Sequence, residues 1–410
     1  MRVALVLAGP YPAPRGSQVL VQQLADGLAA RGHAVHLVTY GPGPTGPPGP
    51  RVARLLRDAV LLPRLWRVVR RAGIDVIHAH NYEAAIAALL VGRVTGRPVV
   101  YHGHNALAEE LPMYFGSAAA RWVAGAFGRL VDGQVPRRAD FCIAVTAELA
   151  RILRARGVAE GGLACIEPAR HPIDVRPVTG RGEPSGLVCY AGNLDGYQNL
   201  DFLLRSFARV RACVPDARLV VVTHAGAGAS AAALAIPGVE VVHAQSFEEV
   251  RGRLLAADVA VSPRAEASGF PMKLLNYMTA GKAIVACVGS AKGIVDGVTG
   301  RVVPDGDEEA FAAAIVALLC DGTERERLGA AARRAVDDPA AWEGVLDRIE
   351  AIYMSVSTRV SAQRARQGST QGSTQVSRQV PTRGSRGAAV RAGARGATER
   401  RAVRGAPAAE

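Results

Sequence analysis

The sequence predicts an α/β protein with two tandem, doubly wound domains that face each other across a cleft. Short β-branched runs alternate with helical patterns along most of the chain, which is typical of parallel sheets covered on both faces. A Pro/Gly-rich break at 177–185 interrupts this alternation before it restarts. With 410 residues, the chain exceeds one ordinary core. Ligands in such folds bind at the carboxyl ends of the strands, so we expect a site in the cleft.

The first half begins the alternation. Its expected strands are 3–8, 34–39, 75–79, 98–102 and 140–145, and a helix is expected at 17–31. Residues 51–71 combine Leu, Val and Trp66 with seven arginines, which also indicates a helix. We favour a helix that packs its apolar face on the sheet and points its arginines outward. The alternative, peripheral contact with an anionic membrane, stays open.

The second half repeats the pattern and ends in an amphipathic helix. Its expected strands are 187–191, 218–223, 239–243, 258–262 and 283–287, and its expected helices are 200–212, 246–256, 273–280 and 308–319. The terminal helix at 339–354 has an apolar face formed by Trp342, Val345, Leu346, Ile349, Ile352 and Tyr353. We therefore expect domains at 1–178 and 186–336, a terminal helix within 337–356 and a tail at 357–410.

Most of the net charge of +13 lies in this tail. Residues 357–410 contain eleven Arg and two acidic residues, a net of 11 − 2 = +9, which leaves 13 − 9 = +4 for the rest. The tail has too few large apolar residues to offset the entropy of ordering, so we expect it to be disordered and rich in Arg, Ser and Gly. We do not expect nucleic acid as a partner.

Cysteine usage and the apolar runs predict a cytoplasmic protein. The six cysteines show no C-x-x-C spacing and fall mostly in apolar runs, which favours buried, reduced thiols. The apolar core of the N-terminus is too short for a signal peptide. No run approaches the ~18–20 apolar residues that a membrane span needs. Peripheral contact with the inner face of the membrane is the alternative.

Two strand-to-helix loops have the features of an anion site. After the first strand, Gly16 permits close backbone approach, Ser17 can cap the helix and Arg15 adds charge. This loop is neither G-x-G-x-x-G nor a P-loop, which disfavours dinucleotide oxidoreductases and NTPases. After the strand 187–191, Gly192 permits close approach, and Asn193 and Gln198 can donate hydrogen bonds.

Lysine is rare, since the chain has 46 Arg and three Lys. Lys273 follows the loop Ser268-Gly269-Phe270-Pro271-Met272 and opens a helix, so backbone N–H groups, the helix end and an ammonium together predict a phosphate site. Lys292 is a second candidate near the cleft. Lys282 is explained by the carbonyl end of the helix before it.

Four of the nine histidines form two H-x-H pairs at strand ends, His78 with His80 and His102 with His104. Residues i and i+2 share one face of a strand, so each pair, or all four, could bind a metal. No Asp or Cys cluster accompanies them, and we favour the interpretation without metal. His104, followed by Asn105, Glu109 and Glu110, better suits hydroxyl binding or acid/base chemistry in a cleft.

In the order of its motifs, the chain resembles family 4 glycosyltransferases of the GT-B type (glycosyl transferases group 1). The resemblance covers about residues 1–355 and rests on the segments 15–17, 32–39, 75–80, 104–105, 190–194, 271–282 and 297–300. It implies a GT-B fold of two Rossmann-like domains, with the acceptor on the first and the nucleotide sugar on the second. It also implies that the terminal helix packs back on the first domain.

The resemblance implies a role for each candidate residue. His104 would be catalytic and lie near the transferred sugar. The donor would be bound by Arg15, Gly16, Gly192, Asn193, Gln198, Ser268, Gly269, Phe270, Pro271, Lys273 and Asn276. Within this set, Gly16 and Lys273 would lie near the diphosphate and Asn276 near the ribose. No metal or other cofactor is expected, because backbone amides and cations can stabilise a departing diphosphate.

The chain departs from the family at four of these positions. Two glutamates, eight residues apart, are usual where this chain has Ser268 and Asn276, and an Arg and a Lys are usual where it has Asn193 and Gln198. Lys273, Lys292, Arg15 and Arg264 are the available substitute cations. We expect a retaining glycosyltransferase that moves a sugar from a nucleotide diphosphate to a hydroxyl of a polysaccharide, lipid-linked or small-molecule acceptor. The alternative is a non-catalytic nucleotide- or sugar-binding protein on the same scaffold.

Overall fold

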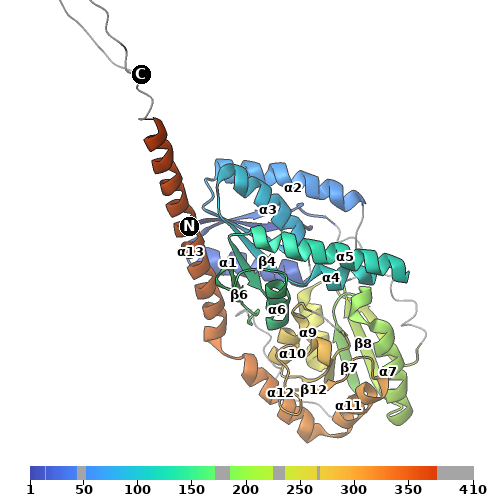
Figure 1. The fold of residues 1–410 in the computed structure, drawn as a ribbon. Coiled ribbons are helices and arrows are strands. Elements are labelled where there is room, and N and C mark those ends of the chain that lie inside the picture. Colours follow the sequence, from blue (N-terminus) through green and yellow to red (C-terminus); the bar gives the residue numbers. More distant parts are fainter. Residues whose placement is uncertain (14, 44–51, 171–184, 225–235, 266–267, 376–410) are drawn as a thin grey trace, which may run out of the picture. The chain divides into compact units, whose positions relative to one another are not determined.

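The structure is a computed structural model that describes residues 1–13, 15–43, 52–170, 185–224, 236–265 and 268–375 (Figure 1). Residues Met1–Ala362 form one compact unit. Within this unit lie two parallel six-stranded sheets, each with its own helices. We call these parts the first and the second lobe.

The first lobe contains a sheet with the strand order β2-β1-β3-β4-β5-β6. Its strands are β1 Arg2–Leu7, β2 Ala34–Val38, β3 Val76–His80, β4 Val99–Gly103, β5 Phe141–Ala144 and β6 Leu163–Cys165. Its helices are α1 Gly16–Ala30, α2 Val52–Arg71, α3 Asn81–Thr95, α4 Leu107–Glu110, η1 Leu111–Tyr114, α5 Ala118–Gln134, η2 Pro136–Arg138, α6 Ala147–Ala155 and η3 Glu160–Gly162. The central strands β3 and β4 are buried throughout, as expected for continuous apolar runs between two helical layers.

The second lobe contains a sheet with the strand order β12-β11-β10-β7-β8-β9. Its strands are β7 Leu187–Ala191, β8 Arg218–Thr223, β9 Val239–His243, β10 Val259–Ser262, β11 Ala283–Cys287 and β12 Arg301–Val303. Its helices are η4 Gly196–Gln198, α7 Leu200–Cys213, α9 Phe247–Ala256, α10 Lys273–Thr279, η6 Val288–Ser290, α11 Glu308–Cys320 and α12 Gly322–Val336. Two apolar clusters, one on each face of this sheet, form its core.

The predicted α/β class and the ten predicted strands are confirmed, and each strand end lies within one residue of its expected position. The structure adds β6 and β12, which the sequence did not predict. Each has only three residues and lies at the edge of its sheet, so neither is long enough to produce a periodic pattern. The Pro/Gly-rich break at 177–185 lies, except for residue 185, outside the described residues.

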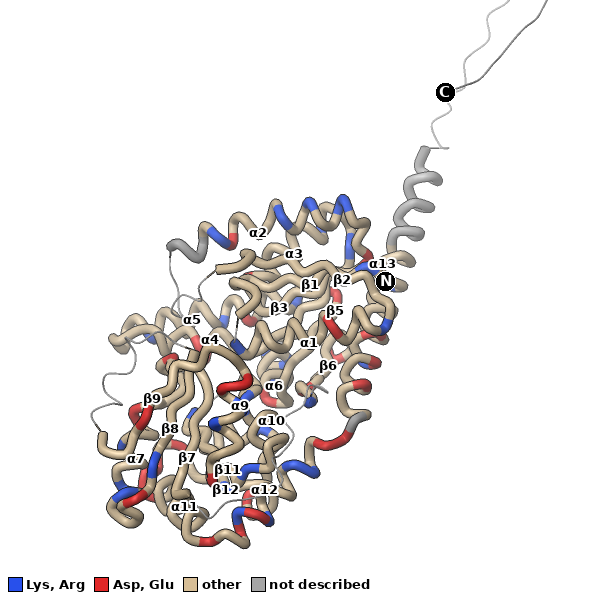
Figure 2. Tube along the Cα trace, turned by 180° about the vertical axis from the view of Figure 1, so that it is seen from behind, with Lys and Arg blue, Asp and Glu red and all other residues tan. Residues whose placement is uncertain are grey.

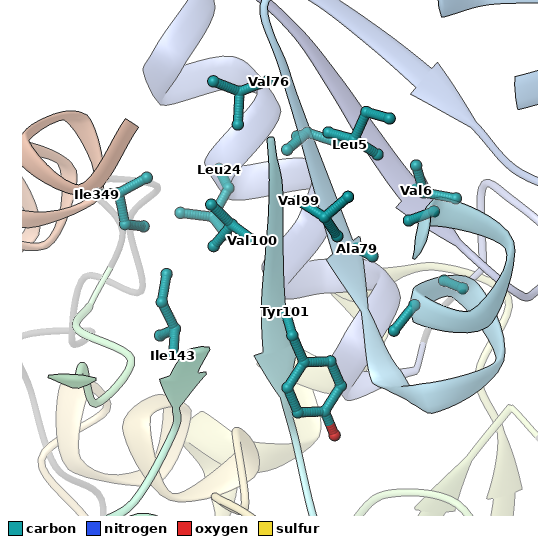
Figure 3. Packing of buried hydrophobic residues seen from close by; sticks show 14 of the residues in the cluster. Leu5, Val6, Leu24, Val76, Ala79, Val99, Val100, Tyr101, Ile143 and Ile349 are labelled. Atoms are coloured by element: carbon teal, nitrogen blue, oxygen red, sulfur yellow. The ribbon is translucent and has the colours of Figure 1, made fainter. Parts of the chain in front are cut away.

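The last helix, α13 (Pro339–Gln375), contributes side chains to the core of the first lobe. Trp342, Leu346 and Ile349 are all buried in that core. Figure 3 shows Ile349 packed among residues of the sheet and of α1. A Cβ on Gly27 of α1 would lie 2.9 Å from Leu346 Cδ1, so the absence of a side chain there lets the two helices approach.

Helix α13 is longer than the sequence predicts, because it continues to Gln375 instead of ending near residue 354. Val356 is fully buried, so the apolar face gains a further turn. Residues 357–367 contain neither Gly nor Pro, and their Ser, Thr, Arg, Ala, Gln and single Val are all compatible with a helix. The remaining part of the expected tail, 376–410, lies outside the described residues.

The cysteine prediction is correct for three of the six thiols. All six cysteines are unpaired, and Cys142, Cys189 and Cys287 are buried. Cys213 and Cys320 are exposed because each is the last residue of a surface helix. Among the described residues, no helix has the length and apolar character needed to cross a bilayer.

Candidate functional site

A polar cavity of about 380 Å³ lies between the two lobes, where the strands of both sheets end. The predicted residues that line it are Arg15, Gly16, His104, Asn193, Ser268, Gly269 and Phe270. The cavity therefore brings together the loop after β1, the end of β4, the turn after β7 and the loop before α10. Gly192, Gln198, Pro271, Lys273 and Asn276 do not line it.

His104 reaches the cavity from the loop that follows β4. Its Nε2 lies 3.0 Å from Nδ1 of His80. Burial lowers the pKa of His104 to about 4, so the imidazole is neutral at neutral pH. A neutral imidazole can orient a sugar hydroxyl or accept a proton, but it is not a ready source of one.

Three more histidines lie behind His104, and we call all four the histidine cluster: His78, His80, His102 and His104. His78, His80 and His102 are almost completely buried. The strand register pairs His80 with His102, which brings both H-x-H pairs onto one face of the sheet. Of the four, only His104 lines the cavity.

Ser268 joins the two lobes at one of the positions where the family usually has glutamate. Its Oγ accepts a hydrogen bond from the Ala106 backbone N–H at 2.7 Å, and its carbonyl accepts one from Thr146 Oγ1 at 2.5 Å. The Ser268 residue is buried. A short hydroxyl can make these contacts with the first lobe while leaving the adjacent cavity open.

Gly269 is required by the close approach of the lobes. A Cβ on this residue would lie 2.7 Å from the carbonyl oxygen of His104, which is too close for any other residue without movement of the backbone. The loop before α10 therefore lies directly against the end of β4, next to the candidate catalytic histidine.

Lys273 lies in a cluster with Tyr190 and Gln198, which we call the lysine cluster. Lys273 Nζ donates to Gln198 Oε1 at 2.6 Å and lies 4.2 Å from the centre of the Tyr190 ring. Burial, with a smaller contribution from Arg264, lowers the pKa of Lys273 well below its usual value. Gly192 belongs to the same place, since a Cβ on it would lie 3.2 Å from Lys273 Nζ. The structure thus groups three predicted donor residues, Gly192, Gln198 and Lys273, outside the cavity lining.

Arg264 lines the cavity next to this cluster, and its guanidinium lies 4.9 Å from the centre of the Tyr197 ring. Among the described ion pairs, neither Lys273 nor Arg264 has a carboxylate partner. Glu266 lies outside the described residues. Two partly buried basic side chains with aromatic and amide neighbours form a suitable environment for an anion such as a diphosphate.

Asp195 is a cavity residue that the sequence analysis missed. Its Oδ2 lies 3.2 Å from Nη1 of Arg15, so an ion pair joins the first lobe to the second. Burial raises the pKa of Asp195, and Arg15 partly opposes this effect. The sequence feature that could have indicated Asp195 is its place in the turn 193–196, two residues after Asn193 and close to the carboxyl end of β7.

The other two lysines have structural contacts. Lys292 pairs with Glu148 at 2.7 Å and so links the lobes away from the cavity lining. Lys282 Nζ donates to the carbonyl oxygens of Leu255 and Ala257, both at 2.6 Å. These carbonyls are at the end of α9, which corrects the expectation that Lys282 caps the helix before it, α10.

A second, mostly apolar cavity, the apolar groove, lies on the first lobe between α2, α3, η1 and α5, with a volume of about 900 Å³. Val123 and Phe127, which line it, are 59% and 54% exposed. Tyr82, Glu83, Glu110 and Tyr114 line both the groove and the polar cavity, so the two spaces share a wall.

Helix α2 borders this groove, and it has both the apolar face and the basic face that the sequence predicts. Leu61, Leu65 and Val69 are buried in the core, which confirms the interpretation of 51–71 as a packed helix. Basic residues follow one another along the same helix (Figure 2). The membrane interpretation concerns this basic face and stays a prediction.

Comparison with known proteins is consistent with this architecture. Residues 14–175 match the family described as Glycosyltransferase Family 4, and residues 185–321 match Glycosyl transferases group 1. Phosphatidyl-myo-inositol mannosyltransferase of Mycobacterium leprae is 26% identical over 381 residues, 87% of this chain and 98% of that protein. D-inositol 3-phosphate glycosyltransferase of Corynebacterium diphtheriae is 24% identical over 306 residues, 68% of this chain and 70% of that protein.

Solved structures share the fold. Sucrose-phosphate synthase from Thermosynechococcus elongatus superimposes with a TM-score of 0.74 at 18% identity, covering 88% of this chain and all of that one. HepE from Anabaena, in complex with UDP and glucose, gives a TM-score of 0.66 at 16% identity, covering 87% of this chain and all of that one.

The two parallel sheets have the GT-B architecture that these solved structures share. The two family matches together span well over half of the residues. The chain belongs to glycosyltransferase family 4.

Proposed function

We propose that this enzyme is a retaining glycosyltransferase that moves a sugar from a nucleotide diphosphate to a hydroxyl of a membrane lipid. The observation that favours a lipid over the other expected acceptors is the apolar groove, which shares a wall with the polar cavity. An acyl chain in the groove would place the polar head of the same molecule in the cavity, because Tyr82 and Tyr114 line both.

The proposed donor site lies on the second lobe. Arg264, which lines the cavity, and Lys273, whose Nζ lies next to Gly192, supply positive charge for the diphosphate. These cations stand in for the Arg and Lys that the family usually has at 193 and 198. Burial removes water from the amino group of Lys273 and disfavours its charge. A bound diphosphate would favour the charged form and would accept hydrogen bonds from a group that is already desolvated. No metal bridges the diphosphate in this proposal.

His104 acts on the sugar from the opposite wall. Its neutral imidazole orients a hydroxyl of the transferred sugar, and its bond to His80 fixes the ring. The close approach of Gly269 keeps the donor loop against this residue. Holding both partners in place lowers the entropic part of the barrier.

The relatives support a lipid acceptor by their names, since several are phosphatidyl-myo-inositol mannosyltransferases. The basic face of α2 lies at the edge of the apolar groove, where it would meet anionic headgroups. We infer peripheral binding at the cytoplasmic face of the membrane.

The test is a transfer assay on the purified full chain with a panel of UDP-, GDP- and ADP-sugars. Acceptors are vesicles of phosphatidylinositol, vesicles of phosphatidylcholine and free inositol. Release of nucleoside diphosphate only with a lipid acceptor would support the proposal. Transfer to free inositol at an equal rate would overturn the lipid acceptor, and nucleotide binding without transfer to any acceptor would indicate a non-catalytic protein.

A pair of variants tests the groove itself. Val123→Asp places a charge in the apolar groove, and Val298→Asp places one on an exposed residue of the second lobe. We expect Val123→Asp to raise the apparent KM for lipid at least about tenfold, since burying an unpaired charge is costly, and Val298→Asp to leave it unchanged. Equal KM values in both variants would remove the groove from the acceptor site.

A further inference from the structure

We propose that His78, His80 and His102 bind a divalent transition-metal ion, with Zn²⁺ as the best fit, inside the core of the first lobe. One ring nitrogen from each of these residues can be chosen so that all three lie within 4.8 Å of one another. The site is separate from the proposed sugar transfer, in which these three residues contact neither donor nor acceptor.

The backbone places the three rings on one face of the sheet. His78 and His80 are two residues apart on β3, and His102 on β4 is the register partner of His80. The ring centres form a triangle with sides of 4.5, 4.9 and 5.1 Å. Because β3 and β4 are central strands, this arrangement is held by the sheet and not by a loop.

Contacts outside the triangle hold two of the rings by one nitrogen each. The Tyr353 hydroxyl lies 2.6 Å from Nδ1 of His78, and Nε2 of His104 lies 3.0 Å from Nδ1 of His80. In each ring the Nε2 atom is then left for the centre. Histidines that bind metal almost always have their other nitrogen held in this way.

Unpaired nitrogens indicate that something is needed at the centre. Nε2 of His80 and Nε2 of His102 are buried and have no hydrogen-bond partner. The contact of 3.1 Å between His78 Nε2 and His102 Nδ1 accounts for one proton and leaves both of these atoms unsatisfied. A buried polar atom without a partner costs about 1–3 kcal/mol, which a metal–nitrogen bond would offset at Nε2 of His80.

The distances and the ligand type favour Zn²⁺. Zn–N bonds of about 2.0–2.1 Å in a tetrahedron place ligand nitrogens about 3.3 Å apart. The contact between His78 Nε2 and His102 Nδ1 already has that spacing, so these two atoms are the ligands from those rings, and a shift of the His80 ring would bring its Nε2 to the ion. Three imidazoles suit zinc and its neighbours in the transition series and do not suit Mg²⁺ or Ca²⁺. The fourth position is left for water.

The ion would connect parts of the first lobe that are distant in sequence. Tyr353 ties the site to α13, and His80 ties it to His104 at the cavity wall. This proposal differs from the expectation from the sequence. There we favour no metal, because no Asp or Cys cluster accompanies the histidines. The sequence shows neither the packing of the three rings against one another nor the two buried Nε2 atoms that this packing leaves without a hydrogen-bond partner.

The experiment measures metal in the full chain, purified without chelator and after removal of any histidine tag. We expect elemental mass spectrometry to detect about one zinc ion per chain. After removal of the ion with a chelator, Co²⁺ should restore about one equivalent with the visible absorption of a four-coordinate site, and Zn²⁺ should raise Tm by several degrees. A chain that holds no metal and responds to neither ion contains a hydrogen-bonded histidine array, which would overturn the proposal.

Variants assign the ion to the site. His78→Gln and His102→Gln keep hydrogen-bonding side chains and should lose the ion and the Co²⁺ spectrum. The matched control is His36→Gln, on β2 of the same sheet, which should bind as the wild type does. Tyr353→Phe removes only the orienting hydroxyl and should weaken Co²⁺ binding about tenfold or more. An ion that both His78→Gln and His102→Gln retain would lie elsewhere, which also overturns the proposal.

Discussion

The histidine cluster and the lysine cluster are two buried polar groups behind opposite walls of one cavity, and they respond to burial in opposite ways. Burial lowers the pKa of His80 and His102 well below the usual value, so both rings stay neutral, and each has a buried Nε2 without a hydrogen-bond partner. Lys273 offers only N–H donors, and it is supported by the Gln198 amide oxygen and the Tyr190 ring. The first environment therefore suits a metal cation, and the second suits an anion.

Replacing His104 by Ala should produce the largest effect in this comparison. Because His104 alone among the four histidines lines the cavity, kcat should fall about 10²-fold or more, as for other groups that act directly on a reacting substrate. Affinity for the nucleoside diphosphate should change by less than about twofold, since the proposed diphosphate site lies on the other lobe. Steady-state kinetics and calorimetry check this, with His36→Ala as the control. A fully active variant would contradict the catalytic role.

Lys273→Ala should weaken nucleoside diphosphate binding about tenfold or more, because a buried charged hydrogen bond is lost. Isothermal titration calorimetry with UDP, GDP and ADP measures this. Lys282→Ala is the matched control, since Lys282 binds the carbonyl end of α9. It should lower the free energy of unfolding by about 1–2 kcal/mol and leave affinity unchanged. Equal affinity in the wild type and Lys273→Ala would remove Lys273 from the site.

Binding should also take up protons through Lys273. Its pKa is lowered in the free protein, and a bound diphosphate would raise it again by favouring the charged form. Affinity should therefore decrease as pH rises above the lowered pKa, because the proton must then be taken from solution. Calorimetry in buffers of different ionisation enthalpy detects the uptake. Proton uptake that persists unchanged in Lys273→Ala would belong to another group.

The smallest effect is expected at the pair of Lys292 and Glu148, which links the lobes outside the cavity lining. Both side chains are partly exposed, so the pair should contribute less than about 1 kcal/mol. We expect Lys292→Ala to change KM for the donor by less than about threefold, and added salt to reduce the difference further. A loss comparable to that of Lys273→Ala would place Lys292 in the donor site instead.

Most of the fold could be predicted from the sequence, because apolar strands of four to six residues give a clear pattern. The edge strands β6 and β12 were missed because three residues carry no period. The length of α13 was underestimated, since burial of Val356 depends on contacts with distant residues. The helices α3, α5, α6 and α12 also had no predicted range, although the alternation of strands and helices implied helices there. The errors therefore concern single elements and one helix end, and the architecture was predicted correctly.

The site could be predicted only where a motif carried the information. Seven of the twelve candidate residues line the cavity, and three of the others, Gly192, Gln198 and Lys273, meet behind it. Asp195 was missed because its importance comes from Arg15, which is distant in sequence. The role of Ser268 in joining the lobes depends on Thr146 and Ala106, and no local pattern announces such contacts.

The packing of α13 also sets an order for folding during synthesis. Trp342, Leu346 and Ile349 complete the core of the first lobe, but the ribosome produces them only after the whole second lobe. The nascent first lobe therefore exposes an apolar seam along α1 while the second lobe emerges and folds. Among the described residues, the core of the second lobe contains none after Val336, so this lobe can complete its core first. The half of the enzyme that is made first is then the half that finishes last.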